Sequence, residues 1–88
     1  MKSKTEEWIE KRIEQNAAIT KDSLILAAEG IQAIIQGIEV MSVVDLIEQI
    51  DSNMAFLVNA QAAIQRNKAL EQTLVMNQKL KINKPAAN

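Results

Sequence analysis

The sequence predicts an all-α protein, an antiparallel hairpin of two long helices that oligomerisation completes into a helical bundle. One proline and two glycines among 88 residues leave few interruptions for a helix before the C-terminal end. Apolar residues recur at spacings of three and four from Ile9 to Met41, and again from Leu46 to Leu74, as amphipathic helices require. Strand-like alternation does not extend over any useful length.

The first helix is expected from about Thr5 to Val40. Ser3-Lys4-Thr5-Glu6 matches the S/T-x-x-E capping box, in which the serine oxygen accepts a free amide of the first turn and the glutamate reaches back. A weaker stop at residues 20–23 leaves a three-helix alternative open. The expected apolar stripe consists of Ile9, Ile13, Ala17, Thr20, Leu24, Ala27, Ile31, Ile34, Ile38 and Met41.

The second helix is expected from about Val43 to Lys79. A second capping box, Ser42-Val43-Val44-Asp45, directly precedes its periodic run. The apolar stripe of this helix would consist of Leu46, Ile47, Ile50, Met54, Leu57, Ala60 and Ile64, followed more weakly by Asn67, Leu70 and Leu74.

These elements predict a single hairpin domain over residues 5–81, with its turn near residues 40–43. Residues 1–4 would form an N-terminal cap. Residues 82–88 would form a flexible tail, because Pro85 cannot continue a helix and little apolar surface remains to dock.

Two helices of similar length joined by a short turn pack as antiparallel neighbours. A turn at residues 41–42 would place Gly30 opposite Asn53 and Ser23 opposite Ala60. A glycine inside a helix costs about 1 kcal/mol relative to alanine, so a close approach of the two backbones would compensate it. The alternative is that one glycine only loosens the turn and the other is incidental. The residues predicted to allow close helix packing are Gly30, Gly37, Ala55 and Ala62.

Near the turn the helices are apolar on more sides than a single buried stripe occupies, as the consecutive apolar run Leu24–Ala28 shows. A helix that is apolar on several sides must be covered on each of them. We therefore expect a homodimer that forms a four-helix bundle, a larger assembly of hairpins, or a permanent complex with a helical partner. The candidate interaction residues are Leu24, Ile25, Ile31, Ile34, Ile35, Ile38, Met41, Val44, Ile47, Ile50, Met54, Leu57 and Ile64.

Cysteine and histidine are absent, which removes the ligands of zinc, iron–sulfur and histidine-ligated haem sites. The same absence excludes cysteine nucleophiles and Ser-His-Asp triads. The glutamates near the first helix start are read as a solvated face, since one unbroken helix cannot wrap a calcium ion. We expect no cofactor, no metal site and no catalytic residue, and therefore no enzyme.

The net charge of −1 conceals a segregated pattern. Residues 1–21 carry five basic and four acidic groups, a net charge of +1; residues 22–65 carry six acidic and no basic groups; residues 66–88 carry five basic and one acidic, a net charge of +4. Folding into a hairpin would collect the positive charge at the open end and the negative charge toward the turn. This layout favours head-to-tail or antiparallel packing of neighbouring rods and a salt-sensitive assembly.

These observations favour a structural or interaction protein that associates with copies of itself or clasps a partner helix. In its expected architecture the chain resembles secretion-system chaperones and subunits of helical appendages, although no motif of either is present. One alternative is a peripheral membrane protein that inserts residues 24–44; another is a small regulator that binds a nucleic-acid machine through its basic end. A cytoplasmic location is expected, because Thr5-Glu6-Glu7 stand where a signal peptide needs apolar residues, while signal-independent export stays open.

Overall fold

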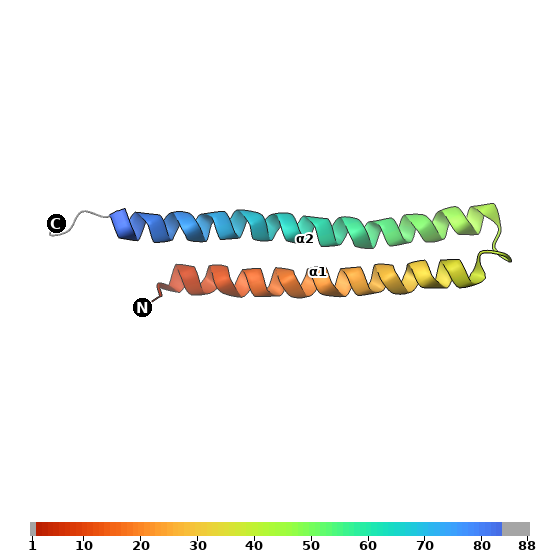
Figure 1. Cartoon of the computed structure of the whole chain (residues 1–88), viewed down its shortest axis with the longest axis horizontal. Helices are drawn as coiled ribbons and strands as arrows, with labels where there is room; N and C mark the ends of the chain where they lie inside the picture. The colour runs from red at the N-terminus through yellow and green to blue at the C-terminus, as the bar shows by residue number, and fades with distance from the viewer. Residues whose placement is uncertain (1, 84–88) are drawn as a thin grey trace.

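A computed structural model describes residues 2–83, with the side chains of residues 2–81. Helix α1 (Lys4–Gly37) and helix α2 (Val43–Asn83) lie side by side and antiparallel, which confirms the predicted hairpin (Figure 1). The molecule is a rod of 73 × 17 × 13 Å. Residues 82 and 83 belong to α2, and the rest of the predicted tail, residues 84–88, lies outside the described part of the chain.

Helix α1 begins at the predicted cap. The Ser3 Oγ accepts a hydrogen bond from the Glu6 backbone N–H at 3.1 Å. The Glu6 side chain does not reach back as a capping box requires; it pairs instead with Lys81 of the other helix. The helix continues through residues 20–23, where the Thr20 hydroxyl donates to the Asn16 carbonyl at 2.8 Å. The three-helix alternative is therefore wrong.

The turn between the helices is slightly longer than predicted. Helix α1 ends at Gly37, three residues before the expected end, and the Val40 N–H donates to the Gly37 carbonyl at 3.1 Å. Helix α2 begins after Ser42, whose Oγ accepts from the Asp45 N–H at 3.1 Å as the second capping box predicts. It continues four residues beyond Lys79, since no residue before Pro85 interrupts it.

Removal of the α2 cap should lower stability by a predictable amount. We expect Ser42→Ala to reduce the free energy of unfolding by about 1 kcal/mol, because the Asp45 N–H loses its acceptor. Ser52→Ala, at an exposed position inside the same helix, should be neutral or slightly stabilising because alanine is the better helix former. Urea unfolding of both variants checks this; equal stabilities would contradict the role of Ser42 as a cap.

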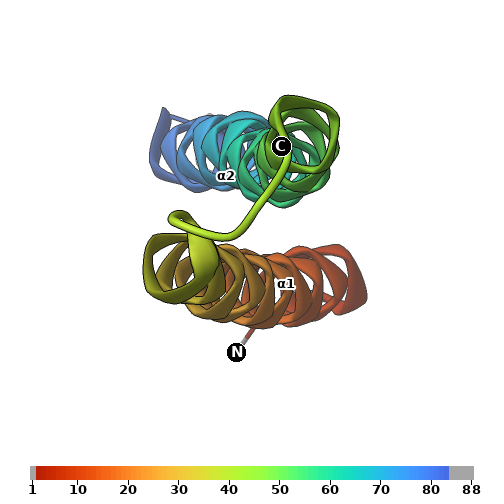
Figure 2. The ribbon, with the colours of Figure 1, turned by 90° about the vertical axis from the view of Figure 1, so that its right-hand side faces the viewer.

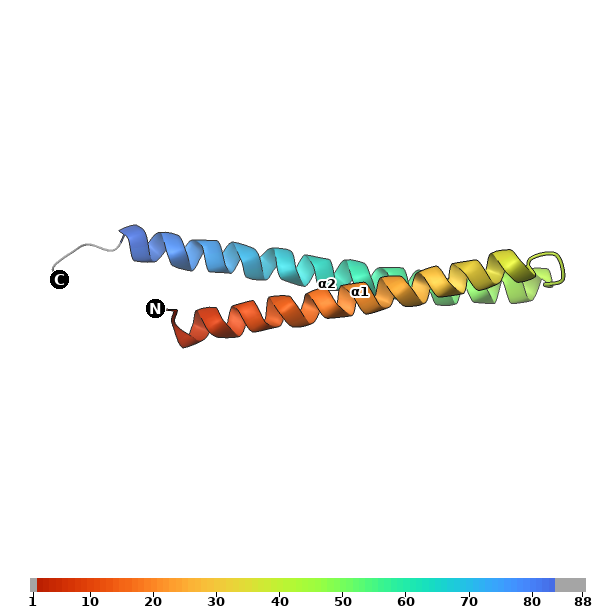
Figure 3. The ribbon, with the colours of Figure 1, turned by 60° about the horizontal axis from the view of Figure 1, so that its bottom comes forward.

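The two helices cross at a shallow angle and separate toward the open end of the rod (Figure 3), while the turn passes across the other end (Figure 2). Their register follows the predicted turn. Gly30 lies directly against the Asn53 side chain, and Ser23 is hydrogen bonded to Asn59, one residue from its predicted opposite, Ala60. Within the described residues, neither helix has a segment long and apolar enough to cross a membrane.

Candidate interaction surface

The contact between the helices, here called the seam, consists mainly of small and polar residues. On α1 it follows alternating steps of three and four residues from Glu6 to Met41, and on α2 it follows the same steps from Asn53 to Asn77. Among the described residues, the buried members of the seam are Glu6, Ile9, Asn16, Ser23 and Ala27 on α1, and Asn53, Ala60 and Ala63 on α2. Among these buried residues, only Ile9 is large and apolar, so the hairpin has little fully buried hydrophobic core of its own.

The predicted apolar stripe of α1 agrees with this seam at six of its ten residues, namely Ile9, Ile13, Thr20, Ala27, Ile34 and Met41, and lies one residue away from it at the other four. The stripe placed Leu24 and Ile31 between the helices, but the structure places Ser23 and Gly30 there. Small side chains let the two backbones approach closely, and short polar side chains can bond across the contact, whereas branched aliphatic side chains would hold the helices apart. As a result, most of the large aliphatic residues near the turn lie on the outer surface of the hairpin.

Polar side chains bond across the seam at several levels. The Asn59 Nδ2 donates to the Ser23 Oγ at 2.8 Å, and the Asn67 Nδ2 donates to the backbone carbonyl of Ile13 at 3.0 Å. A buried asparagine at a contact between helices can fix their register, at some cost in stability. These hydrogen bonds join residues 36 and 54 positions apart, so a shift of one helix along the other would break both.

The middle of the seam also contains polar atoms that are incompletely paired. The Asn16 Oδ1 accepts a long hydrogen bond of 3.4 Å from the Arg66 Nε. Within the described residues, the Asn16 Nδ2 and the Asn67 Oδ1 are buried and have no hydrogen-bond partner. A buried polar atom without a partner costs about 1 to 3 kcal/mol, so this seam specifies a register without supplying much stability.

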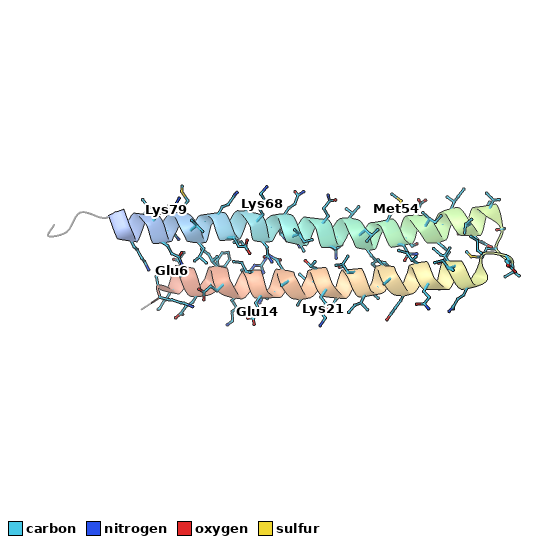
Figure 4. All side chains as sticks on the ribbon, viewed as in Figure 1. Glu6, Glu14, Lys21, Met54, Lys68 and Lys79 are labelled. Carbon is cyan, nitrogen blue, oxygen red and sulfur yellow. The ribbon has the colours of Figure 1, made fainter. Side chains whose placement is uncertain are left out.

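Two shallow depressions show which side chains share a face of the rod. Ala17 of α1 and Ile64 of α2 line the same depression, whereas Arg12 and Arg66 line another. In packed helices that follow a seven-residue repeat, residues seven or fourteen positions apart lie on the same side. Met54 and Lys68, fourteen residues apart, accordingly lie on the same side of α2 (Figure 4). The side of the rod with Ala17 and Ile64, and the side with Arg12 and Arg66, can therefore each be followed along the helices in steps of seven residues.

One face that results is apolar over the half of the rod next to the turn. We call it the apolar face. Its nine large side chains are each between 42% and 65% exposed. It consists of Ala17, Leu24, Ala28, Ile31, Ile35 and Ile38 from α1, and Ile47, Ile50, Met54, Leu57 and Ile64 from α2. Most of the candidate interaction residues thus fall into one continuous surface that sequence reasoning had placed partly inside the hairpin.

The other candidate interaction residues lie outside the apolar face. Ile25 and Val44 are exposed but belong to other sides of their helices, and Ile34 and Met41 are half-buried in the seam. Gly30 has the close approach that was proposed for it. A Cβ added to Gly37 would lie 3.8 Å from the Met41 side chain, an ordinary contact.

Ala55 and Ala62, the residues proposed for close packing on α2, are exposed and half-buried respectively. The alanines that the structure buries in the seam are Ala60 and Ala63. Sequence reasoning had included Ala60 in the apolar stripe but had not singled out Ala63. Both alanines could have been predicted from the sequence, because they lie seven and ten residues after Asn53 and so continue the same spacing of three and four residues.

Ion pairs gather at the open end. Lys81 of α2 pairs with the buried Glu6 of α1, which ties the end of one helix to the start of the other. Lys2 donates to Glu10 at 2.8 Å, and this hydrogen bond and the charge of Glu10 raise the pKa of Lys2 above its usual 10.5. A raised lysine pKa favours the folded state at neutral pH, and this contribution is lost only as the pH rises through the pKa of Lys2. Both groups are exposed, so the contribution is small.

Between residues 2 and 83, acidic side chains nowhere gather in threes that could hold a metal ion. No protein-family model, curated protein or solved structure matches the chain. Fold and surface together define its class: a two-helix hairpin with a polar seam and an uncovered apolar face.

Proposed function

We propose that the chain is a non-enzymatic assembly protein whose hairpins associate through the apolar face. The observation that supports this is the distribution of the large aliphatic residues, most of which are exposed on the outer surface of the hairpin rather than buried in its seam. Exposed apolar patches beyond a few hundred Å² mark interaction sites on stable proteins. Here the patch extends over both helices, is interrupted by Lys21 and Gln61, and is flanked by acidic residues at the turn and by basic residues toward the open end.

The amount of exposed surface supports the same proposal. The chain exposes 7043 Å², whereas a compact monomer of 9.8 kDa exposes about 5,200 Å². The excess of roughly 1,800 Å² exceeds the ~800 Å² that each partner contributes to a standard protein interface. Association is therefore the way for this chain to bury as much surface as an ordinary domain of its size.

Sedimentation equilibrium tests the proposal. At tens of micromolar and low salt, we expect an average mass of at least twice 9.8 kDa, with the helix content retained. A stable, fully helical monomer of 9.8 kDa at that concentration would overturn self-association. Vesicle flotation is the companion measurement: we expect the chain not to rise with the lipid, and flotation without self-association would favour insertion of residues 24–44 instead.

Association should weaken as salt is added. The segregated charges attract between copies only when unlike ends meet, and salt screens this attraction over about 10 Å at 0.1 M. We expect the dissociation constant to rise several-fold between about 0.05 M and 0.5 M sodium chloride, measured by sedimentation at a series of concentrations. An unchanged dissociation constant would show that the charge pattern does not contribute to assembly.

A further inference from the structure

We propose that a second copy of this chain covers the apolar face in an antiparallel arrangement, in which the turn of each hairpin lies toward the open end of the other. This inference rests on the proposed self-association and adds its surface, orientation and register. Three observations carry it: the shape of the apolar face, the position of its midpoint and the charges at its two ends.

The apolar residues form two rows whose midpoints coincide. On α1 the row extends from Ala17 to Ile38, with Lys21 as its one charged member, and on α2 it extends from Ile47 to Ile64, with Gln61 as its one polar member. Their midpoints lie between residues 27 and 28 and between residues 55 and 56. These points are opposite each other, because the register that sets Gly30 against Asn53 brings them to the same level. A two-fold axis through this level superimposes each apolar row on its own copy.

A two-fold axis across the rods makes each helix pack on its counterpart. Helix α1 then lies on α1 of the other copy and α2 on α2, in opposite directions, which gives a four-helix bundle with the apolar faces inside. At this register Ala17 of one copy is level with Ile38 of the other, and Leu24 is level with Ile31. All four residues belong to the same row of the apolar face.

The charges select this orientation over the parallel one. Side by side in the same direction, the two segments 22–65 would bring six acidic groups against six others. In the antiparallel arrangement, Lys68 of one copy is level with Val43 at the turn of the other, between two acidic residues that flank this turn, and Lys21 is level with Gln49, next to the third. Lys68 borders the depression lined by Ala17 and Ile64, at the edge of the apolar face. Those acidic residues are Glu39, Asp45 and Glu48.

Disulfide cross-linking tests the arrangement, and the chain suits it because it contains no cysteine. Two variants, Ala17→Cys and Ile38→Cys, are mixed as full-length chains and oxidised. The two positions are about 31 Å apart along one helix, whereas a disulfide needs Cα atoms within about 7 Å. Antiparallel packing predicts that the mixed disulfide between residues 17 and 38 exceeds either homodisulfide at least fivefold. The matched control pairs Arg12→Cys with Ala33→Cys, which have the same spacing on the opposite face and should not cross-link.

The outcomes separate this inference from the proposed function. Each variant is first sedimented in reduced form, so that loss of association is recognised before oxidation. A dimer that yields homodisulfides, no disulfide at all, or the control disulfide keeps self-association but overturns the antiparallel use of the apolar face. A monomer in the unmodified chain overturns both. The mixed disulfide from an associated sample supports both.

Discussion

Ile31→Glu should abolish association of the hairpins while Leu26→Glu leaves it nearly unchanged. The two residues lie on the same helix, are both aliphatic, and are 43% and 47% exposed. The two substitutions should therefore have similar effects on the stability of a single hairpin. Only Ile31 belongs to the apolar face. Leu26 lies two repeats after Arg12, on the opposite face that includes the Arg12–Arg66 depression.

The expected size of the effect follows from burial. Covering an isoleucine side chain contributes about 1.5 to 3 kcal/mol, and a symmetric dimer contains the substituted residue twice. Loss of both contributions corresponds to at least about a 100-fold rise in the dissociation constant. Sedimentation of the two variants at matched concentrations measures it. Equal weakening by Ile31→Glu and Leu26→Glu would show that association does not use the apolar face.

Gly30→Ala should destabilise the hairpin, although alanine is the better helix former. A Cβ on Gly30 would overlap the Asn53 side chain, with the amide carbon 2.7 Å and the amide nitrogen 2.9 Å away. Asn53 is buried and cannot easily move, because its Nδ2 donates to the Gln49 carbonyl at 2.9 Å. Overpacking of this kind costs about 1 to 3 kcal/mol and outweighs a gain of about 1 kcal/mol in helix propensity.

Gly37→Ala is the matched control, because its Cβ would meet only an ordinary contact with Met41. We expect it to raise the free energy of unfolding by up to about 1 kcal/mol. Asn53→Ala in the Gly30→Ala background should recover most of the loss, and the coupling in the double-mutant cycle should exceed about 1 kcal/mol. Denaturant unfolding at one fixed protein concentration provides all four values. If Gly30→Ala and Gly37→Ala are equally stabilising, the helices do not approach at Gly30.

The hairpin itself could be predicted from local signals. Both capping serines, Ser3 and Ser42, act as expected, and the position of the turn correctly placed Gly30 opposite Asn53. These features depend on short stretches of sequence and on counting residues from the turn. They require no knowledge of which side chains pack together.

The seam could not be predicted in the same way, because two rows with the same period run next to each other. Gly30 and Ile31 are neighbours in sequence, and either one continues a pattern of threes and fours. Hydrophobicity favours the row with Ile31 as the buried one. The structure buries the other row, in which Gly30 packs directly against Asn53, because small side chains let the two helices approach closely.

The charge pattern could be read from the positions of the charged residues in the sequence, but its meaning depends on the fold. Glu6 and Lys81 are 75 residues apart in sequence and pair directly at the open end. This contact shows that the positive segments at the two chain ends meet, as the hairpin prediction required. The orientation proposed for two copies follows from this arrangement together with the position of the apolar face.

The central claim is that association covers the apolar face and thereby completes the fold. Thermal unfolding of the unmodified chain, followed by circular dichroism at concentrations from about 1 to 100 µM, tests this most directly. Because a partner that binds only the folded state raises its stability by mass action, we expect the midpoint of unfolding to rise steadily with concentration. A cooperative transition whose midpoint is the same across this range would mean that the hairpin is stable alone, and would contradict the claim.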